Sequence, residues 1–287
     1  MLRVPPLRHA AHSIIKRMIP ATLEVDGIRL VMNRQDPVIC GALTLGCYER
    51  FELDVFRSAL AEGMNVLDIG ANIGLFTVVA SKYTGQTGKV IAVEPLPVNC
   101  EFLTETIRQN GLTNIEIEQV AVSNNSGDRE LFLSPENKGD NRLFPGGKNW
   151  RSVSVPMTTV DDIVKRHNMD RVDLIKMDIQ GSEGLAIQGM TETLRRNPHV
   201  MILMEFWASG LESLGTAPDK VLATICELGF TIYHIDCDNN TLRKLDDPLE
   251  LLVGNTERTY KNLALLGPGY DGKMTAGALS KREVSRN

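Results

Sequence analysis

The segment 66–76, VLDIGANIGLF, gathers residue types that bind ligands, because an apolar run meets an acid, two glycines and an asparagine. Gly70 allows a tight turn and close approach of the backbone to a ligand, and the N–H groups of a following helix attract an anionic group. Asp68 suits an ammonium group or a bound water, and Asn72 can both donate and accept. We therefore expect Asp68, Gly70, Asn72 and Gly74 to form a nucleotide loop.

Glu94, at the end of the apolar run VIAVEP, strengthens this interpretation. A carboxylate at the end of the next strand can accept both hydroxyls of a ribose, which predicts an adenosine-type ligand. A dinucleotide loop has the form G-x-G-x-x-G, whose second glycine makes room for pyrophosphate. Asn72 stands at that place, which favours a ligand with a carboxylate and an amino group, such as S-adenosylmethionine (SAM).

The segment LIKMDIQGSE holds a second group of charged residues. Alternate side chains of a strand share a face, so Lys176 and Asp178 are expected to point together. In one interpretation Asp178 and Glu183 face the reacting groups and Lys176 orients Asp178, because perturbed charges at a ligand edge are often catalytic. In the other, Lys176 and Asp178 form a buried ion pair, and Glu183 only complements a helix N-terminus.

Further candidates lie in the second half of the chain. Glu205, at the end of the run MILMEFW, either faces the pocket or is a buried, hydrogen-bonded acid. Asn141 and Arg142 lie in the polar loop GDNRLFPGG and either contact a sugar, carboxylate or phosphate or are solvated, since loops over sheets often set specificity. His167 and His199 are interpreted as surface or structural residues. No set of metal ligands is evident, so we expect chemistry without a metal.

Alternating strands and helices must position these residues. We expect a β-hairpin around Asp26-Gly27, followed by an amphipathic helix that ends at Gly63. The polar stretch 124–152 is expected to be a substrate loop or a partly structured insertion. This order predicts a mostly parallel sheet with helices on both faces. The expected helices are 47–62, 75–84, 99–111, 158–168, 182–197 and 218–229, and the expected strands are 65–71, 89–95, 114–123, 172–179, 199–207, 230–236 and 261–268.

Composition limits the class of protein. The net charge of −5 and the aromatic content of 5% argue against a nucleic-acid partner. There is no apolar run long enough to span a membrane. Five scattered cysteines without a CxxC pair are expected to be free thiols in a protein core, in a cytoplasmic protein. The basic start of the chain is expected to be a loosely packed helix, with a membrane-surface or partner-binding arm as the alternative.

Four consecutive segments resemble motifs of the FkbM-type SAM-dependent methyltransferases. They are VLDIGANIGLFTVVASK, GKVIAVEPLPVNCEFLTETIRQNGL, VAVSNNSGDREL and VDLIKMDIQGSEGLAIQGM, within a resemblance from about Gly46 to Trp207. The resemblance implies a seven-stranded Rossmann-like sheet with SAM over the first two strand ends. It also places Tyr48 in the family's YE element, which makes Tyr48 a candidate substrate residue. One departure is Gln180, where the family usually has Glu.

We therefore expect an N-terminal extension over 1–45, a methyltransferase domain over 46–267 and a mobile tail over 268–287. The predicted reaction is O-methylation of a hydroxyl on a small-molecule or glycan-like acceptor, a preference that comes from the resemblance. The alternatives are an NAD-dependent oxidoreductase, against which Asn72 argues, and a non-catalytic scaffold that binds a partner.

Overall fold

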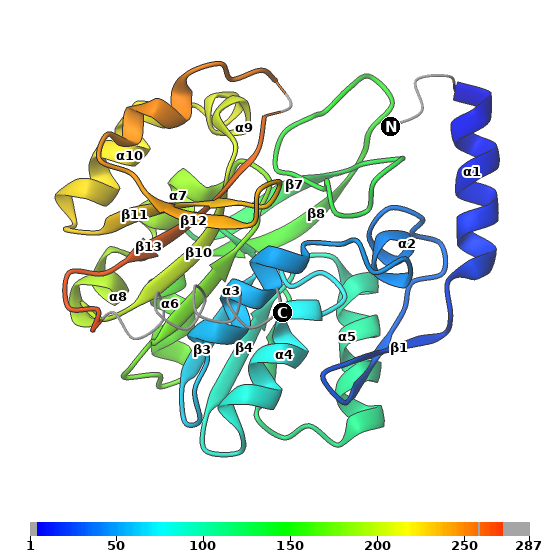
Figure 1. Cartoon of the computed structure of the whole chain (residues 1–287), viewed down its shortest axis with the longest axis horizontal. Coiled ribbons are helices and arrows are strands. Elements are labelled where there is room, and N and C mark those ends of the chain that lie inside the picture. Colours follow the sequence, from blue (N-terminus) through cyan, green and yellow to red (C-terminus); the bar gives the residue numbers. More distant parts are fainter. Residues whose placement is uncertain (1–4, 258, 272–287) are drawn as a thin grey trace, which may run out of the picture.

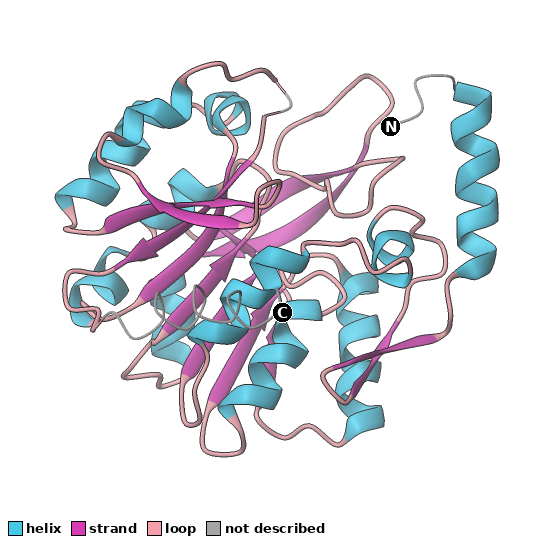
Figure 2. Cartoon of the chain, viewed as in Figure 1, coloured by secondary structure: helices cyan, strands magenta, loops and turns pink. Residues whose placement is uncertain are grey.

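A central sheet carries helices on both of its faces in the computed structural model, which describes residues 5–257 and 259–271 (Figure 1, Figure 2). The helices are α1 (Pro5–Met18), α2 (Ile39–Thr44), α3 (Arg50–Ala59), α4 (Leu75–Thr84), α5 (Pro97–Asn110), α6 (Val160–Arg166), α7 (Glu183–Gln188), α8 (Thr191–Arg196), α9 (Ala208–Ser213), α10 (Pro218–Glu227) and the 3-10 helix η1 (Pro248–Leu252). The strands are β1 (Thr22–Val25), β2 (Ile28–Val31), β3 (Asn65–Ile69), β4 (Lys89–Val93), β5 (Ile115–Glu118), β6 (Ala121–Val122), β7 (Gly127–Leu133), β8 (Arg151–Thr158), β9 (Leu174–Met177), β10 (Met201–Phe206), β11 (Thr231–Asp236), β12 (Thr241–Lys244) and β13 (Lys261–Leu266).

The large sheet has the strand order β12-β11-β13-β10-β9-β3-β4-β5. Strands β5, β4, β3, β9 and β10 pair in parallel, whereas β13 is antiparallel to both β10 and β11. The α/β class and the mostly parallel sheet are thus confirmed, but the sheet has eight strands where seven were expected. The extra strand β12 arises because the chain turns back after β11, through a turn in which Asn240 is left-handed, and adds an edge.

Alternate residues of the central strands pack into different cores, as expected for strands buried on both faces. Val66 lies in a cluster with residues of α3 and α4, whereas its neighbour Leu67 lies in a cluster with residues of α6, α7 and α10. The parallel strands therefore end at one edge of a rigid layer, and this edge carries the predicted ligand residues.

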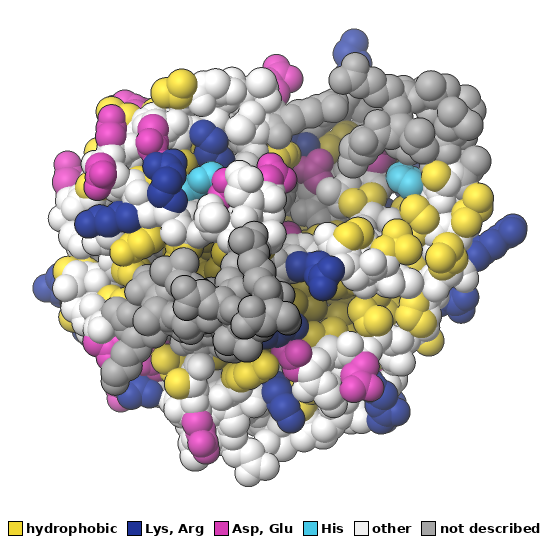
Figure 3. Space-filling view, viewed as in Figure 1, with side chains coloured by type: hydrophobic (Ala, Val, Ile, Leu, Met, Phe, Trp, Pro, Cys, Tyr) yellow, Lys and Arg dark blue, Asp and Glu magenta, His cyan; other side chains and the backbone are white. Residues whose placement is uncertain are grey.

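The N-terminal hairpin is confirmed as β1 and β2, with Asp26 and Gly27 both at positive φ in the turn. Strand β2 contacts α4 and α5, and the hairpin shares the hydrophobic cluster of α3 and α4. Helix α1 follows the same edge of the molecule, where hydrophobic side chains gather on the surface (Figure 3). Ile14 and Met18 of this helix are exposed. Of the expected tail, residues 272–287 lie outside the described residues. No helix within 5–257 or 259–271 is long and apolar enough to cross a membrane.

Most expected elements differ from the structure by one or two residues at their ends, and three differ by more. Helix α3 ends at Ala59, where the backbone becomes extended, so Gly63 belongs to the turn before β3. The strand expected over 114–123 is split: β5 pairs with β4, and β6 joins β7 and β8 in a separate small sheet. The stretch 124–152 is therefore partly structured, since it contains β7 and the start of β8, and its role as a substrate loop stays a prediction. The helix expected over 182–197 is broken at Gly189 into α7 and α8.

The cysteines were expected to be core residues, and this is wrong for three of them. Cys40 and Cys100 are buried, whereas Cys47, Cys226 and Cys237 are exposed. Cys226 lies on the solvent side of α10, whose buried face is formed by other positions. The five cysteines are free thiols.

Candidate functional site

A cavity of about 1540 Å³ opens at the carboxyl ends of β3, β4, β9 and β10 and under the loop 134–150. Ligands of open α/β sheets bind at this edge. Cavities for one small ligand are roughly 300–1,000 Å³, so the volume admits two molecules side by side. The lining includes every sequence-predicted site residue except Gly74 and Glu183.

The loop after β3 is shaped by three left-handed residues, Gly70, Asn72 and Gly74. The N–H groups of Gly70 and Ala71 both donate to Val93 O, at 2.8 and 3.0 Å, which fixes the loop to the next strand. A Cβ at Gly70 would lie 2.0 Å from Asp178 O, so the loop packs directly on the end of β9. Gly74 begins α4, and a Cβ there would meet Leu103 Cδ1 at 2.4 Å. Gly74 thus shapes the loop from beneath the cavity.

Asn72 and Glu94 are joined by the backbone. The N–H of Asn72 donates to Glu94 Oε2 at 2.9 Å, and Asn72 Oδ1 accepts from the Ile73 N–H at 2.8 Å. Glu94 Oε1 also accepts from Leu96 N at 2.9 Å and from Asn99 Nδ2 at 3.2 Å. Three of the roughly four acceptor positions of a carboxylate are therefore used, and one is left for a ligand hydroxyl. Burial raises the pKa of Glu94 to about 7.

Asp68, in β3, lies at the base of the loop and is 2% exposed. Its Oδ2 accepts a short hydrogen bond from Thr77 Oγ1 of α4. Burial raises the pKa of Asp68 to about 6, although Thr77 and the charge of Lys176 oppose this rise. A cationic ligand group beside Asp68 would stabilise its ionised form.

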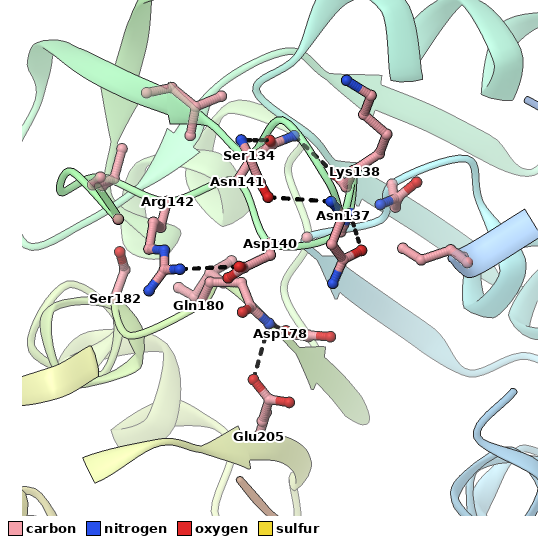
Figure 4. Close-up of a pocket in the computed structure, with 18 of the residues that line it drawn as sticks. Ser134, Asn137, Lys138, Asp140, Asn141, Arg142, Asp178, Gln180, Ser182 and Glu205 are labelled. Atoms are coloured by element: carbon pink, nitrogen blue, oxygen red, sulfur yellow. Dashed lines mark hydrogen bonds and ion pairs between the residues drawn. The ribbon is translucent and has the colours of Figure 1, made fainter. Parts of the chain in front are cut away.

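Asp178 and Glu205 face the cavity from adjacent strand ends and are joined by Gln180. The Gln180 amide donates to Asp178 Oδ1 at 2.8 Å and to Glu205 Oε2 at 2.9 Å (Figure 4). A glutamate at position 180 could not donate to both carboxylates in this way. Burial, and then the charges of Asp178 and Glu183, hold the pKa of Glu205 well above its usual range. Glu205 is thus one of the pocket acids.

Lys176 does not pair directly with Asp178 as the sequence suggested. Its Nζ lies 3.0 Å from Glu52 Oε1 of α3, and both side chains are almost fully buried. The ammonium also lies 4.9 Å from the centre of the Phe76 ring. Burial alone lowers the pKa of Lys176, but the charges of Glu52 and Asp178 outweigh it, so the pKa is raised. The direct partner comes from a helix that strand periodicity does not reveal.

Glu183 is fully buried and lies outside the cavity lining. Its Oε1 accepts from Ile179 N at 3.0 Å and its Oε2 from Gly181 N at 2.9 Å. Its contacts match the interpretation of Glu183 as an acid at a helix start, because it holds the turn that follows β9. Glu183 therefore shapes the turn behind the cavity wall, and its catalytic role stays a prediction.

Tyr48 lines the cavity together with Glu49, which sequence reasoning named only as part of a motif. Glu49 precedes α3 and has a left-handed backbone, with φ 41° and ψ 37°. Such a conformation is uncommon for residues other than glycine and is often found at functional sites. Glu49 is therefore a further candidate site residue, and its left-handed backbone could not be predicted from the sequence.

Asn141 and Arg142 were expected either to contact a sugar, carboxylate or phosphate or to be solvated, and in the structure both are half-buried and hydrogen-bonded within the loop 134–150. Asn141 Oδ1 accepts from Ser134 N at 3.0 Å and its Nδ2 donates to Lys138 O at 2.9 Å, so Asn141 shapes the loop (Figure 4). Arg142 pairs with Asp140 at 2.9 Å. Its guanidinium also lies over the rings of Phe144, Trp150 and Trp207, at 5.0, 4.5 and 4.9 Å from their centres. Arg142 therefore fixes the loop against the cavity wall.

The two candidate structural histidines lie outside the cavity lining. His167 contacts Glu116 and Glu118, and His199 Nε2 lies 3.5 Å from Asp173 Oδ1. Among the described residues, no three His, Cys, Asp or Glu side chains are grouped to hold a metal ion.

Residues 68–232 match the family model described as the Methyltransferase FkbM domain. Methyltransferase sdnD of Sordaria araneosa is 26% identical over 200 residues, which cover 58% of this chain and 73% of that protein. Hexuronic acid methyltransferase AglP of Haloferax volcanii is 29% identical over 157 residues, which cover 53% of this chain and 62% of that protein. The chain thus spans less than two thirds of this second relative. A SAM-dependent methyltransferase from Aquifex aeolicus has a crystal structure with a TM-score of 0.41 and 17% identity, over 75% of this chain and 88% of that one.

Proposed function

Because the chain belongs to the FkbM family of SAM-dependent methyltransferases, we propose that it methylates a hydroxyl group of a small-molecule or glycan-like acceptor. The observation that carries this proposal is the contact between the two halves of the cavity. Gly70 of the loop packs on the backbone of Asp178, so a donor held by the loop lies beside the carboxylates of the β9 and β10 ends.

The donor side fits SAM through Asp68, Gly70, Asn72, Gly74 and Glu94. The absent side chain at Gly70 leaves the backbone open to close approach. Glu94 retains one acceptor position for a ribose hydroxyl, and Asp68 is an acceptor for the ammonium of an amino acid. When bound, SAM supplies a methyl group on a positively charged sulfur.

The acceptor side is assigned to Asp178, with Gln180 and Glu205 as its supports. Gln180 uses its amide to fix Asp178, whose half-buried carboxylate is open to the cavity. A fixed carboxylate orients an acceptor hydroxyl by accepting its hydrogen bond, and orientation is a large part of catalysis between two bound molecules. Tyr48 lies beside these groups as a further acceptor contact.

The acceptor class rests on similarity and on the character of the cavity. The printed name of the Haloferax relative is a hexuronic acid methyltransferase, which supports a glycan-like acceptor here. Carboxylates, amides and aromatic side chains together line the acceptor side, and this mixture is typical of sites that bind polyhydroxylated molecules.

Calorimetric titration with SAM and with NAD tests the donor. We expect SAM to bind, Glu94→Ala to abolish this binding, and Glu101→Ala, at an exposed position of α5, to retain it. Binding of NAD without SAM would refute the proposal in favour of an oxidoreductase.

Transfer of labelled methyl from SAM to hexoses, hexuronic acids and their glycosides tests the acceptor. We expect Asp178→Asn to retain SAM affinity and to lower turnover about 10²-fold, the size of loss that misplacement of a reacting group causes. Unchanged turnover would remove Asp178 from the site. Binding of SAM without transfer to any hydroxylated acceptor would favour the scaffold.

A further inference from the structure

Glu49 is a pocket carboxylate to which the proposed function gives no task. It is half-buried and lines the same cavity as Gly70, Lys176 and Asp178. Its backbone is left-handed, a conformation that is uncommon for a residue with a Cβ. Helix α3 starts immediately after it.

The charges around Glu49 come from four elements. Tyr48 and Glu52 belong to its own segment, and Lys176 and Asp178 come from the end of β9. Glu205 of β10 and Cys237, after β11, are also close enough to interact with its charge. The only ammonium among these groups is Lys176, and its direct ion pair is with Glu52 at 3.0 Å.

Glu49 therefore lies near other carboxyl groups, and the nearby ammonium of Lys176 is already paired with Glu52. Burial raises the pKa of Glu49 to about 8, the charges of Glu52 and Asp178 add to this rise, and Lys176 and the Tyr48 hydroxyl oppose it. A carboxyl group that gains and loses its proton near neutral pH is suited to general base catalysis. Asp178 differs from Glu49 in its contacts, because it accepts a hydrogen bond from the Gln180 amide.

We propose that Glu49 is the general base of this site, and that it loses its own proton when the positive charge of the methyl donor is bound beside it. The inference rests on the proposed function. The acceptor oxygen forms its bond to the methyl carbon as the carbon–sulfur bond breaks, sulfur keeps the bonding electron pair, and the hydroxyl proton moves to the carboxylate of Glu49. Once the sulfur is neutral, Glu49 holds this proton more firmly and keeps it as the products leave. The proton passes to water when the next molecule of SAM binds, so one proton is released in each turnover.

The role of Asp178 is then to orient the acceptor, and that of Glu49 is to remove the proton. This division of roles gives the left-handed Glu49 a function at the cavity. It also predicts that the positive charge of the donor changes the protonation of Glu49, and this change can be measured without an acceptor.

The test compares binding of SAM with binding of S-adenosylhomocysteine, which differs from SAM by the methyl group and the positive charge. Calorimetry at pH 7.5 in buffers of different ionisation enthalpy gives the number of protons released. The ribose and the amino acid group are common to both ligands, so their effects on Asp68 and Glu94 cancel in the difference. We expect SAM to release roughly half to one proton more than S-adenosylhomocysteine.

In Glu49→Gln this difference should disappear, while it should persist in Glu205→Gln and in Asp54→Asn, an exposed position of α3. Glutamine resembles the protonated form of Glu49, so the variant is expected to fold and to bind both ligands. With an acceptor in hand, Glu49→Gln should lower kcat at least 10²-fold and remove the ionisation near pH 8 from the pH profile of kcat/KM.

Equal proton release by the two ligands in the unaltered protein, or an undiminished difference in Glu49→Gln, would overturn the role of Glu49 and leave the methyltransferase proposal standing. Absence of SAM binding would overturn the proposed function itself. The two failures are therefore distinguishable by the same titrations.

Discussion

Gly70→Ala tests the contact that joins the donor loop to the acceptor side. The backbone at Gly70 has φ +87°, and an added Cβ would lie 2.0 Å from Asp178 O and 2.9 Å from Asp178 C. Both atoms belong to the backbone at the end of β9, so they cannot rotate away as a flexible side chain would. The loop or the strand end must move to accommodate the methyl group.

The free energy of this change has two parts. A left-handed conformation costs a residue with a Cβ about 1–2 kcal/mol, and overfilling a packed site costs about 1–3 kcal/mol. Gly70→Ala should therefore lower the free energy of unfolding by roughly 2–5 kcal/mol. With about 2–4 °C per kcal/mol in a chain of this size, Tm should fall by roughly 5–20 °C.

Gly111→Ala is the matched control, because Gly111 ends α5 with φ +61° and its added Cβ would meet nothing within 4 Å. This variant should lose only the conformational part, about 1–2 kcal/mol. The two parts are separated by urea unfolding of both variants and by calorimetry with SAM. Gly70→Ala should also bind SAM more weakly, whereas Gly111→Ala should bind it normally. Equal stability and equal SAM affinity in the two variants would refute the close packing of the loop on Asp178.

Three further predictions concern the supports of the site. Lys176→Met should lower the free energy of unfolding by about 3–5 kcal/mol, because it leaves Glu52 as a buried charge without its cation. Urea unfolding of the double variant Lys176→Met/Glu52→Gln should show that part of this stability is regained. If none is regained, the ion pair does not explain the loss. Burial raises the pKa of Glu183 in the folded protein to about 7 from 4.5, so between these pH values the native state binds more protons than the unfolded state. The free energy of unfolding should therefore fall, on the order of 3 kcal/mol, as pH rises through this range. In Glu183→Gln the free energy of unfolding, measured in urea, should vary less between pH 5 and 7.5, and the same pH dependence in both proteins would contradict this. Asn141→Ala should raise the KM for the acceptor several-fold, since it removes two hydrogen bonds that shape the loop, and should leave the Kd for SAM unchanged. Steady-state kinetics measure the KM, and calorimetry measures the Kd. An unchanged KM would show that the loop does not contact the acceptor.

Local sequence patterns predicted the elements whose causes are local. The turn at Asp26-Gly27 needs two left-handed residues, and the hairpin is found there. Helix α4 has the predicted bounds of Leu75–Thr84, because its apolar run begins after a glycine and ends before one. The loop after β3 could be predicted for the same reason, since Gly70, Asn72 and Gly74 all occupy left-handed positions.

Features set by distant contacts were not readable. The helix over 182–197 is broken at Gly189, where an added Cβ would lie 2.1 Å from Ser123 O, so a remote segment packs against the break. The polar and exposed first half of β7, GDRE, made the stretch 124–152 appear to be only a polar loop or insertion. Strand β8 begins near the end of this stretch, and its alternation of Val153, Val155 and Met157 is a strand signal that the sequence prediction missed. Lys176 was assigned to Asp178 by strand periodicity, but Glu52 supplies the direct ion pair from a helix more than a hundred residues earlier.

The charges on the acceptor side of the cavity bear on the order in which the two ligands bind. Glu49, Asp178 and Glu205 face the cavity, and Lys176 is paired with Glu52. Arg142, the nearby guanidinium of the loop, is paired with Asp140 and enclosed by aromatic rings. The site therefore binds a positively charged donor more favourably than an anion, and its carboxyl groups ionise more readily once that donor is present. Because donor binding prepares the base, we expect the donor to bind before the acceptor. The methylated acceptor should then be a noncompetitive product inhibitor toward SAM, and a competitive pattern would contradict this order.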